Sequence, residues 1–321
     1  ASKLTRPMRA QAVYTTGAIV LRPQLAIYDG MAQDFMLTFR KMNGLGNEIV
    51  VVDARGSGGR IMANHAAALA TSPATRFDQL MVLYDAEASE TNARVEIFNT
   101  DGSSAEACGN GMRCVALVEL EATGMTRQRY ETVAGELDVV AKGAERITVD
   151  MGAPRLEWDQ IPLSDPFNDT KRIELQVGPI DAPILHSPSV CNMGNPHAIF
   201  WVDDVDAYDL GRTGPLLEHH PQFPEGANIS IAQVDSPTSA RVRTWERGAG
   251  LTKACGTAAC ATLVSGVRLR KLERTARIVL PGGPLDITWD EASNHVLMTG
   301  PAELERTGTA TFHADGSVTI P

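Results

Sequence analysis

Short runs of β-branched and aliphatic residues, separated by turn residues, recur along most of the chain, as is typical of β-strands. They lie at residues 49–52, 94–98, 137–140 and 147–150, and again at 198–202, 228–232, 240–245, 278–280 and 285–289. Two segments differ, because residues 110–120 and 257–267 are small or aliphatic at nearly every position. A helix that is apolar all round is expected to be enclosed by other elements. We therefore expect two sheets, each wrapped around one central helix.

The two helical segments belong to an internal duplication. The triplet Ala107-Cys108-Gly109 recurs 147 residues later as Ala254-Cys255-Gly256. The spacing is kept on both sides, since residues 98–99 lie over 245–246 and, one residue further apart, 135–139 lie over 283–287. A nearly constant offset over about 100 residues has the size of a domain, so it indicates a duplicated domain and not a short structural repeat.

These patterns predict an α+β protein of two pseudo-symmetric duplicated domains, each a mostly antiparallel, barrel-like sheet around a central helix. We assign residues 36–153 to the first domain and 154–301 to the second. Residues 302–321 are predicted to form strands that return to the first domain. Residues 1–35 are predicted to be an extension outside the core; the absence of Asp and Glu from residues 1–28 also fits a transit peptide.

Composition narrows the classes of function. The formal net charge of −10 argues against a nucleic-acid or anionic-membrane partner, because phosphate binding needs clustered Lys and Arg. No apolar run reaches the length of a membrane-spanning helix. The five cysteines are odd in number and form no CxxC motif, which argues against a disulfide framework and a zinc site. Reduced thiols in a chain of this size fit the cytoplasm.

The cysteines at the two helix starts have the surroundings of reactive groups. The first N–H groups of a helix lack internal partners and form an anion site. A glycine there lets a ligand approach the backbone, and a cysteine there tends to have a lowered pKa. Cys108 and Cys255 meet both conditions. Cys114, Cys191 and Cys260 lack them, so we interpret these three as buried structural residues.

Two such helix starts, packed around a pseudo-twofold axis, suit proton chemistry at an α-carbon. Their N–H groups would hold one carboxylate and stabilise the charge that develops when the α-proton leaves. One thiolate would remove the proton while the opposite thiol returns one to the other face. The pattern predicts an amino-acid epimerase that needs no pyridoxal phosphate, no other cofactor and no metal.

Seven ordered segments resemble the diaminopimelate epimerase family, over roughly residues 38 to 320. They are KMNGLGN at 41–47, FDQ at 77–79, FNTDGSSAEACGNGMRC at 98–114, GNPH at 194–197, GAN at 226–228, WERG at 245–248 and ACGTAAC at 254–260. The resemblance implies the duplicated fold, conversion between LL- and meso-diaminopimelate for lysine and peptidoglycan precursors, and a homodimer. The small-molecule substrate would be the only further partner.

The resemblance also implies residue roles. Cys108 and Cys255 would be catalytic. The reacting carboxylate would bind the N–H groups of Gly109, Asn110, Gly256 and Thr257. The remaining substrate-binding residues would be Asn47, Gln79, Asn99, Asn195, Asn228, Glu246 and Arg247, supported by His197. An arginine that reads a second carboxylate fits a substrate that is an amino acid at both ends.

Plainer interpretations stay open for several of these residues. Asn47 and Asn195 also fit turn chemistry, His197 a structural histidine, and Glu246 with Arg247 a solvated pair. Three other functions remain alternatives: a proline or hydroxyproline racemase with the same cysteines, a thiol-redox protein that pairs Cys108 with Cys255, and a non-catalytic amino-acid-binding protein.

Overall fold

The described residues of the computed structural model, 33–105 and 108–321, form two halves with the same order of elements. Residues 1–32 of the predicted extension, and Ala107 of the first repeated triplet, lie outside this description. The first half contains β1 (Phe35–Asn43), β2 (Glu48–Asp53), α1 (Ala63–Thr71), β3 (Gln79–Tyr84), β4 (Ala93–Asn99), β5 (Ser104–Ala105), α2 (Gly109–Thr123), β6 (Arg127–Thr132), β7 (Gly135–Ala141) and β8 (Ile147–Asp150).

The second half repeats this order after a small separate hairpin of β9 (Gln176–Val177) and β10 (Leu185–His186). It contains β11 (Ser189–Asn192), β12 (Pro196–Trp201), a 3-10 turn (Val205–Ala207), α3 (Leu210–Glu218), β13 (Asn228–Ser236), β14 (Ser239–Glu246), β15 (Gly250–Thr252), α4 (Gly256–Arg268), β16 (Thr275–Leu280), β17 (Gly283–Trp289) and β18 (Val296–Gly300). The chain ends with β19 (Glu303–Phe312) and β20 (Val318–Thr319).

The strand pairing shows the duplication directly. In the first half β1–β2 is antiparallel, β2–β3 parallel, β3–β4 and β4–β5 antiparallel, β4–β6 parallel, and β6–β7 and β7–β8 antiparallel. The second half has the same series, from β11–β12 to β17–β18. The prediction of mostly antiparallel sheets is therefore confirmed, with two parallel pairs in each half.

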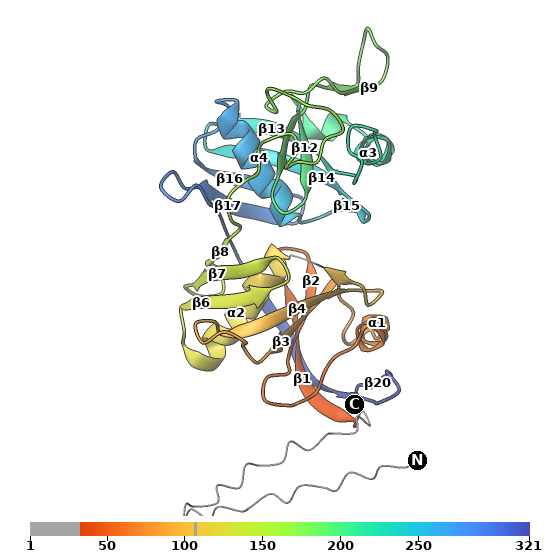
Figure 1. Ribbon diagram of the computed structural model, residues 1–321, viewed down its shortest axis with the longest axis vertical. Coiled ribbons are helices and arrows are strands. Elements are labelled where there is room, and N and C mark those ends of the chain that lie inside the picture. Colours follow the sequence, from red (N-terminus) through yellow and green to blue (C-terminus); the bar gives the residue numbers. More distant parts are fainter. Residues whose placement is uncertain (1–32, 106–107) are drawn as a thin grey trace, which may run out of the picture. The chain divides into compact units, whose positions relative to one another are not determined.

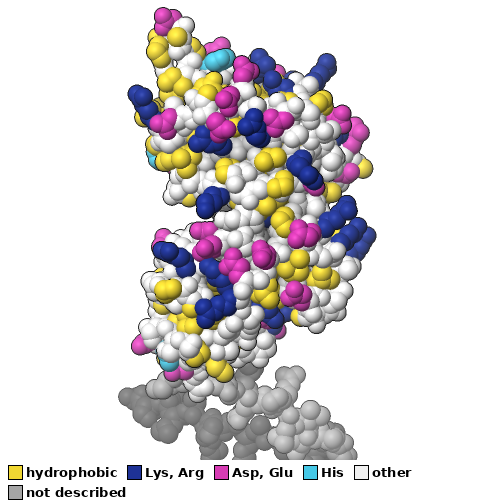
Figure 2. Space-filling view, turned by 180° about the vertical axis from the view of Figure 1, so that it is seen from behind, with side chains coloured by type: hydrophobic (Ala, Val, Ile, Leu, Met, Phe, Trp, Pro, Cys, Tyr) yellow, Lys and Arg dark blue, Asp and Glu magenta, His cyan; other side chains and the backbone are white. Residues whose placement is uncertain are grey.

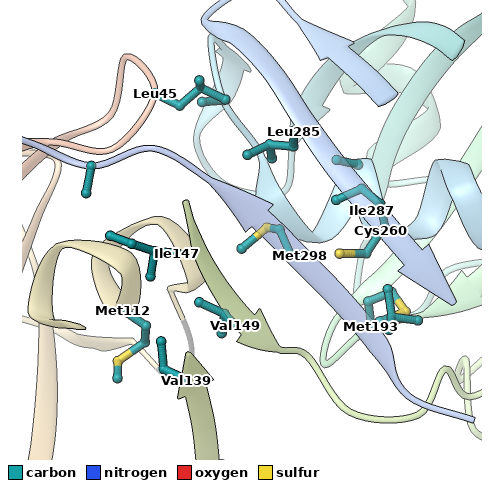
Figure 3. Close-up of a cluster of buried hydrophobic side chains, with 14 of the residues drawn as sticks. Leu45, Met112, Val139, Ile147, Val149, Met193, Cys260, Leu285, Ile287 and Met298 are labelled. Atoms are coloured by element: carbon teal, nitrogen blue, oxygen red, sulfur yellow. The ribbon is translucent and has the colours of Figure 1, made fainter. Parts of the chain in front are cut away.

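A central helix fills each half, as the all-round apolar segments predict. In α2 the side chains from Asn110 to Glu119 are buried, and in α4 those from Ala258 to Gly266. Both helices join one large cluster of buried hydrophobic residues, part of which is drawn in Figure 3. In that cluster Met298 of β18 stands opposite Val149 of β8, because the two strands pair antiparallel and link the sheets of the two halves.

The last strands belong to the first half. β19 pairs antiparallel with β1 from Phe35↔Phe312 to Asn43↔Glu303, and β20 pairs antiparallel with the end of β19. In Figure 1 the blue end of the chain, with β20, accordingly lies beside β1. The boundaries that the sequence assigns to the two domains stay a prediction, since residues Gln33–Pro321 form one compact unit.

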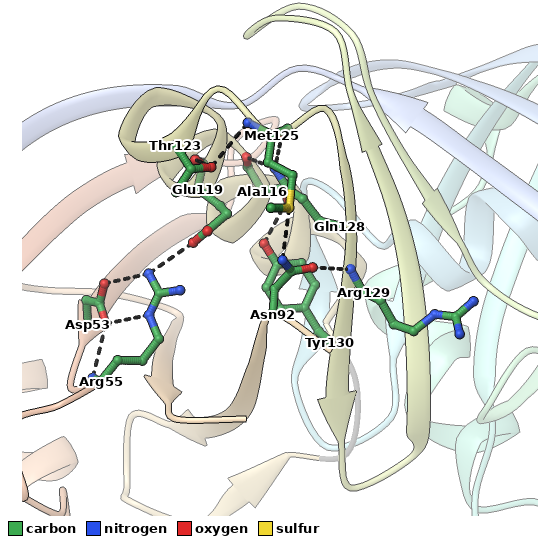
Figure 4. Close-up of polar contacts among 10 residues, drawn as sticks. All are labelled: Asp53, Arg55, Asn92, Ala116, Glu119, Thr123, Met125, Gln128, Arg129 and Tyr130. Carbon is green, nitrogen blue, oxygen red and sulfur yellow. Dashed lines mark hydrogen bonds and ion pairs between the residues drawn. The ribbon is translucent and has the colours of Figure 1, made fainter. Parts of the chain in front are cut away.

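A buried polar network holds α2 in the first half (Figure 4). The Arg55 guanidinium contacts Asp53 at 2.8 Å and Glu119 of α2 at 2.9 Å. Gln128 donates to the carbonyl of Ala116, and Tyr130 donates to Gln128. Burying these groups is tolerable because nearly all their polar atoms find partners.

The two shorter helices, α1 and α3, are absent from the sequence prediction. Each is nine residues long, and α3 contains Pro215. They occupy equivalent places, since α3 begins 147 residues after α1. No helix among the described residues has the length and hydrophobicity to cross a membrane. On the face visible in Figure 2, acidic and basic side chains are interspersed over both halves.

Candidate active site

Both predicted catalytic cysteines occupy the position just before a central helix. Cys108 precedes α2 in an extended conformation, and its Sγ accepts a hydrogen bond from the Gly111 N–H at 3.1 Å. Cys255 precedes α4 in the same way, with its Sγ 3.5 Å from the Thr257 hydroxyl. The N–H groups of the first helical turns thus lie next to the thiols, where an anion is stabilised.

The glycines after the two cysteines touch the same side chain. A Cβ atom on Gly109 would lie 2.5 Å from Cε of Met298, and one on Gly256 would lie 2.8 Å from its Sδ. A side chain at either position would therefore have to displace Met298. Because one methionine contacts both glycines, the two helix starts are neighbours, as the predicted chemistry requires.

A hydrogen bond also joins the two cysteine segments. The Asn110 Nδ2 donates to the carbonyl of Ala254 at 2.9 Å, and Ala254 directly precedes Cys255. The side chain of Asn110 is buried, and its Oδ1 accepts from Arg113 at 3.0 Å. Asn110 therefore has a structural task in addition to the predicted use of its N–H.

The structure places Glu246 beside Cys255. Glu246 ends β14, is half-buried, and accepts a hydrogen bond from the Thr252 hydroxyl. Burial raises the pKa of Glu246, while the Thr252 and Cys255 hydrogen bonds lower it. Glu246 is therefore partly withdrawn from solvent, whereas Arg247 next to it is exposed.

The pKa values of the two thiols differ from the expectation for helix starts. Burial raises the pKa of Cys108 to about 11, partly offset by the Gly111 N–H and the charge of Arg113. Burial raises the pKa of Cys255 well above its usual value, and the nearby Glu246 carboxylate raises it further. The expectation of lowered pKa values is wrong because desolvation outweighs the helix-terminal donors.

Three amides of the first half lie at the ends of neighbouring strands. Gln79 begins β3 and is paired with Asn99, which ends β4. Asn47 directly precedes β2, and its Oδ1 is buried without a hydrogen-bond partner in the described residues. The Asn47 carbonyl also accepts from the Gly44 N–H, so a turn role and a free side-chain acceptor occur together. A buried acceptor of this kind can take a hydrogen bond from a ligand or from an ordered water.

The corresponding amides of the second half surround His197. The His197 Nε2 lies 2.7 Å from Oδ1 of Asn195 and 3.5 Å from Nδ2 of Asn228. His197 is completely buried, and its Nδ1 lacks a partner among the described residues. Burial, with the charge of Arg247, lowers the pKa of His197 to about 3, so the ring is neutral.

Arg247 lies at the outer end of this group. Its N–H donates to Oδ1 of Asn228 at 2.9 Å, and its guanidinium donates to the carbonyl of Glu225 at 3.0 Å. Arg247 also lines a pocket of about 340 Å³ together with Phe223 and Glu218. This exposed position leaves guanidinium N–H groups available for an anion.

The other three cysteines, Cys114, Cys191 and Cys260, are fully buried in the hydrophobic cluster. In the described ranges, no three His, Cys, Asp or Glu side chains lie close enough together to hold a metal ion.

Comparisons with known proteins identify the family of the chain. A family model described as diaminopimelate epimerase matches residues 39–157 and 189–305. A protein of Rhizobium meliloti (strain 1021) named diaminopimelate epimerase is 57% identical over 272 residues, covering 84% of this chain and 90% of that protein. The chain belongs to the diaminopimelate epimerase family. Another member, from Methylobacterium sp. (strain 4-46), is 58% identical over 275 residues, covering 84% and 94%.

Solved structures show how widely the fold of this epimerase is shared. A hydroxyproline epimerase from Agrobacterium vitis has a TM-score of 0.60 at 15% identity, covering 87% of this chain and 93% of that one. A PhzF-family protein of Bacillus anthracis has a TM-score of 0.60 at 16% identity, covering 86% and 99%. At these identities the likeness concerns the fold alone, and it confirms the predicted fold class.

Two residues that contact the candidate site residues are missing from the sequence prediction. Glu218 of α3 accepts from the Trp245 indole at 2.6 Å and from the Gly248 N–H at 2.8 Å, and so holds the turn that carries Glu246 and Arg247. Arg113 contacts Asn110 from within α2. Arg113 stands in the quoted CGNGMRC motif, whereas nothing in the sequence pattern indicates Glu218.

Proposed function

We propose that this protein interconverts LL- and meso-diaminopimelate by moving a proton at one α-carbon between two cysteines. The observation that supports this most is the contact of both helix starts with Met298, with one cysteine before each. Family membership supports the substrate, because the relatives at 57–58% identity bear its name.

In the proposed reaction, a thiolate at one cysteine takes the α-proton from the substrate. The electron pair of the broken C–H bond moves into the adjacent carboxylate, where the N–H groups at the starts of α2 and α4 stabilise the charge. The thiol of the other cysteine then donates its proton to the opposite face of the carbon. The enzyme ends with thiol and thiolate exchanged, and the α-carbon is inverted.

Substrate recognition is assigned to the two groups of polar residues. Asn47, Gln79 and Asn99 come from the first half, and Asn195, Asn228 and Arg247 from the second. Arg247 is proposed to bind the distal carboxylate, since its guanidinium is exposed and its backbone N–H bonds the side chain of Asn228. Glu246 is proposed to accept from the reacting ammonium, and His197 to orient the amides around it.

The remaining parts of the proposal follow from the same site and family. The reaction needs no pyridoxal phosphate, because two protein bases do the proton transfer. We further propose a cytoplasmic homodimer that supplies precursors of lysine and peptidoglycan.

The experiment is to incubate the reduced protein with pure LL-diaminopimelate in D2O. Conversion to the meso form with one deuterium at one α-carbon is the expected result. If neither isomerisation nor deuterium exchange occurs while the thiols are shown to be reduced, the substrate assignment is wrong. Proline and hydroxyproline would then be tested in the same assay.

A further inference from the structure

Arg113 is a fully buried arginine without an acidic partner among the described residues. Its Nε donates to the carbonyl of Pro301 at 2.9 Å, and its Nη1 donates to Asn110 at 3.0 Å. Its Nη2 is buried and has no hydrogen-bond partner in the described ranges. A guanidinium keeps its charge in proteins, and burying a charge without a counter-charge costs free energy.

The surroundings of Arg113 contain thiols where a carboxylate would be expected. Its charge acts on Cys108, Cys114 and Cys260, which are the nearby groups able to become anions. Cys114 and Cys260 are fully buried in the apolar cluster, and burial raises the pKa of both. Cys108 is the half-buried one, and Arg113 lowers its pKa. Of these three groups, Cys108 is therefore the accessible one that could compensate the buried charge once it is ionised.

Arg113 also determines the orientation of Asn110. A guanidinium is a donor only, so the amide oxygen of Asn110 must face Arg113 and the amide nitrogen must face the other way. That nitrogen donates to the carbonyl of Ala254, next to Cys255. Arg113, Asn110 and Ala254 thus connect α2, which follows Cys108, to the residue that precedes Cys255.

The structure leaves space for this arrangement. A Cβ atom on Gly300 would lie 3.2 Å from Nε of Arg113. The equivalent position in the duplicated half, 147 residues later, is Cys260 and carries no charge. The two halves therefore contain one such arginine between them.

We propose that Arg113 is a positioning residue of this site, which holds the two cysteine segments together through Asn110 and supplies a buried positive charge that favours the Cys108 thiolate. This inference rests on the proposed two-cysteine function. Burial opposes the Cys108 thiolate most strongly and the Glu246 carboxylate adds to this effect, whereas the Gly111 N–H acts in the same direction as Arg113.

The test measures the ionisation of Cys108 without using the substrate. The rate of alkylation by iodoacetamide is followed against pH, and the label is located by peptide mass spectrometry. Arg113→Met removes the charge at similar volume, and Arg113→Lys keeps the charge but loses the two-sided contact. Arg268→Met is the matched control, because Arg268 lies in the other central helix and bonds Thr170 and Val190.

In Arg113→Met the pH midpoint of Cys108 alkylation should rise by about one unit or more, equal to a tenfold loss of thiolate. In Arg113→Lys it should stay near that of the unmodified protein while kcat falls, and in Arg268→Met it should not move. An unchanged midpoint in a folded Arg113→Met protein would overturn the proposal, because a merely structural arginine affects stability and not this titration.

Asn110→Asp covers the case in which Arg113→Met does not fold. This change keeps the shape and places a carboxylate beside Arg113, so the arginine gains a counter-charge, and it also replaces the Nδ2 donor to the Ala254 carbonyl with an acceptor. The Cys108 midpoint should again rise, and an unchanged midpoint would contradict the role of the charge. If the protein does not act on diaminopimelate but these shifts occur, the proposed function fails while the role of Arg113 stands.

Discussion

The two halves repeat the same strand pairing, yet the charges beside their cysteines are opposite. Cys108 has the buried Arg113 in its own helix, while Cys255 has the Glu246 carboxylate beside it. The repeat position of Arg113 is Cys260 and that of Glu246 is Asn99, so each charge exists in one half only.

This difference separates the contribution of the duplicated fold from that of single residues. The duplication supplies two geometrically similar helix starts, and the later divergence of single residues makes the two thiols unlike. A proton transfer between two like groups needs one of them ionised and the other protonated. Environments that push two pKa values apart assign such roles, and the Arg113 charge lowers the pKa of Cys108 while the Glu246 carboxylate raises that of Cys255.

The largest effect is expected from removing either thiol. Cys108→Ala and Cys255→Ala should each lower kcat/KM for epimerisation by about a thousandfold or more, since general acid–base groups contribute on this scale. The conversion of LL- to meso-diaminopimelate is followed by chiral chromatography. Near-normal activity in either variant would show that one thiol is enough for epimerisation, and it would contradict the assignment of one base to each half.

Removal of the second half's charge should make the two thiols more alike. In Glu246→Gln the pKa of Cys255 should fall, because the carboxylate that raises it is gone. The pH dependence of alkylation at Cys255 should move toward that of Cys108, and kcat/KM should drop by about a hundredfold. A Cys255 midpoint that rises or stays constant would contradict the assigned asymmetry.

The halves also differ in how the central helix is held. The Arg55–Glu119 ion pair joins α2 to the residues after β2. In α4, by contrast, Arg268 donates to two uncharged oxygens, the Val190 carbonyl and the Thr170 hydroxyl. Glu119→Gln should lower the free energy of unfolding by about 1–3 kcal/mol, because it weakens a buried charge pair. Urea unfolding measures this, with the exposed Asp138→Asn as a control expected to change it by less than about 1 kcal/mol.

The smallest effect concerns stability in acid. The pKa of His197 is about 3 in the folded protein and 6.5 in its usual state, so the unfolded chain binds an extra proton between these values. Stability should therefore decline as the pH falls from 6.5 toward 3, and this decline should be weaker in His197→Gln. Urea midpoints at pH 7.5 and 5 provide the measurement; equal declines in both proteins would contradict it.

Much of the fold could be predicted because its signals are local. The two central helices are apolar on every side and start at a repeated Cys-Gly pair, and the alternating strands have turn residues at their ends. The strand β3 lacks this alternation, since Leu80 to Tyr84 are all buried, and α3 is short and contains a proline. A pattern of period two or 3.6 is weak in such segments.

The site could be predicted only in part. A charged residue is normally expected at the surface, and so Arg113 gave no indication of complete burial. Its contacts lie with Met298 and Pro301, far along the chain, and are settled by the pairing of β8 with β18. The pKa values of the thiols likewise depend on burial, which a local motif does not determine.

The pairing of β19 with β1 has a consequence for how the protein is made. The second half is complete in sequence when β18 leaves the ribosome, whereas the sheet of the first half still lacks its closing strand. At ordinary rates of synthesis, roughly 15 to 50 s separate the emergence of β1 from that of β19. The sheet of the first half can be completed only when the last residues have been made. The nascent chain therefore exposes an unpaired edge of β1 through most of its synthesis.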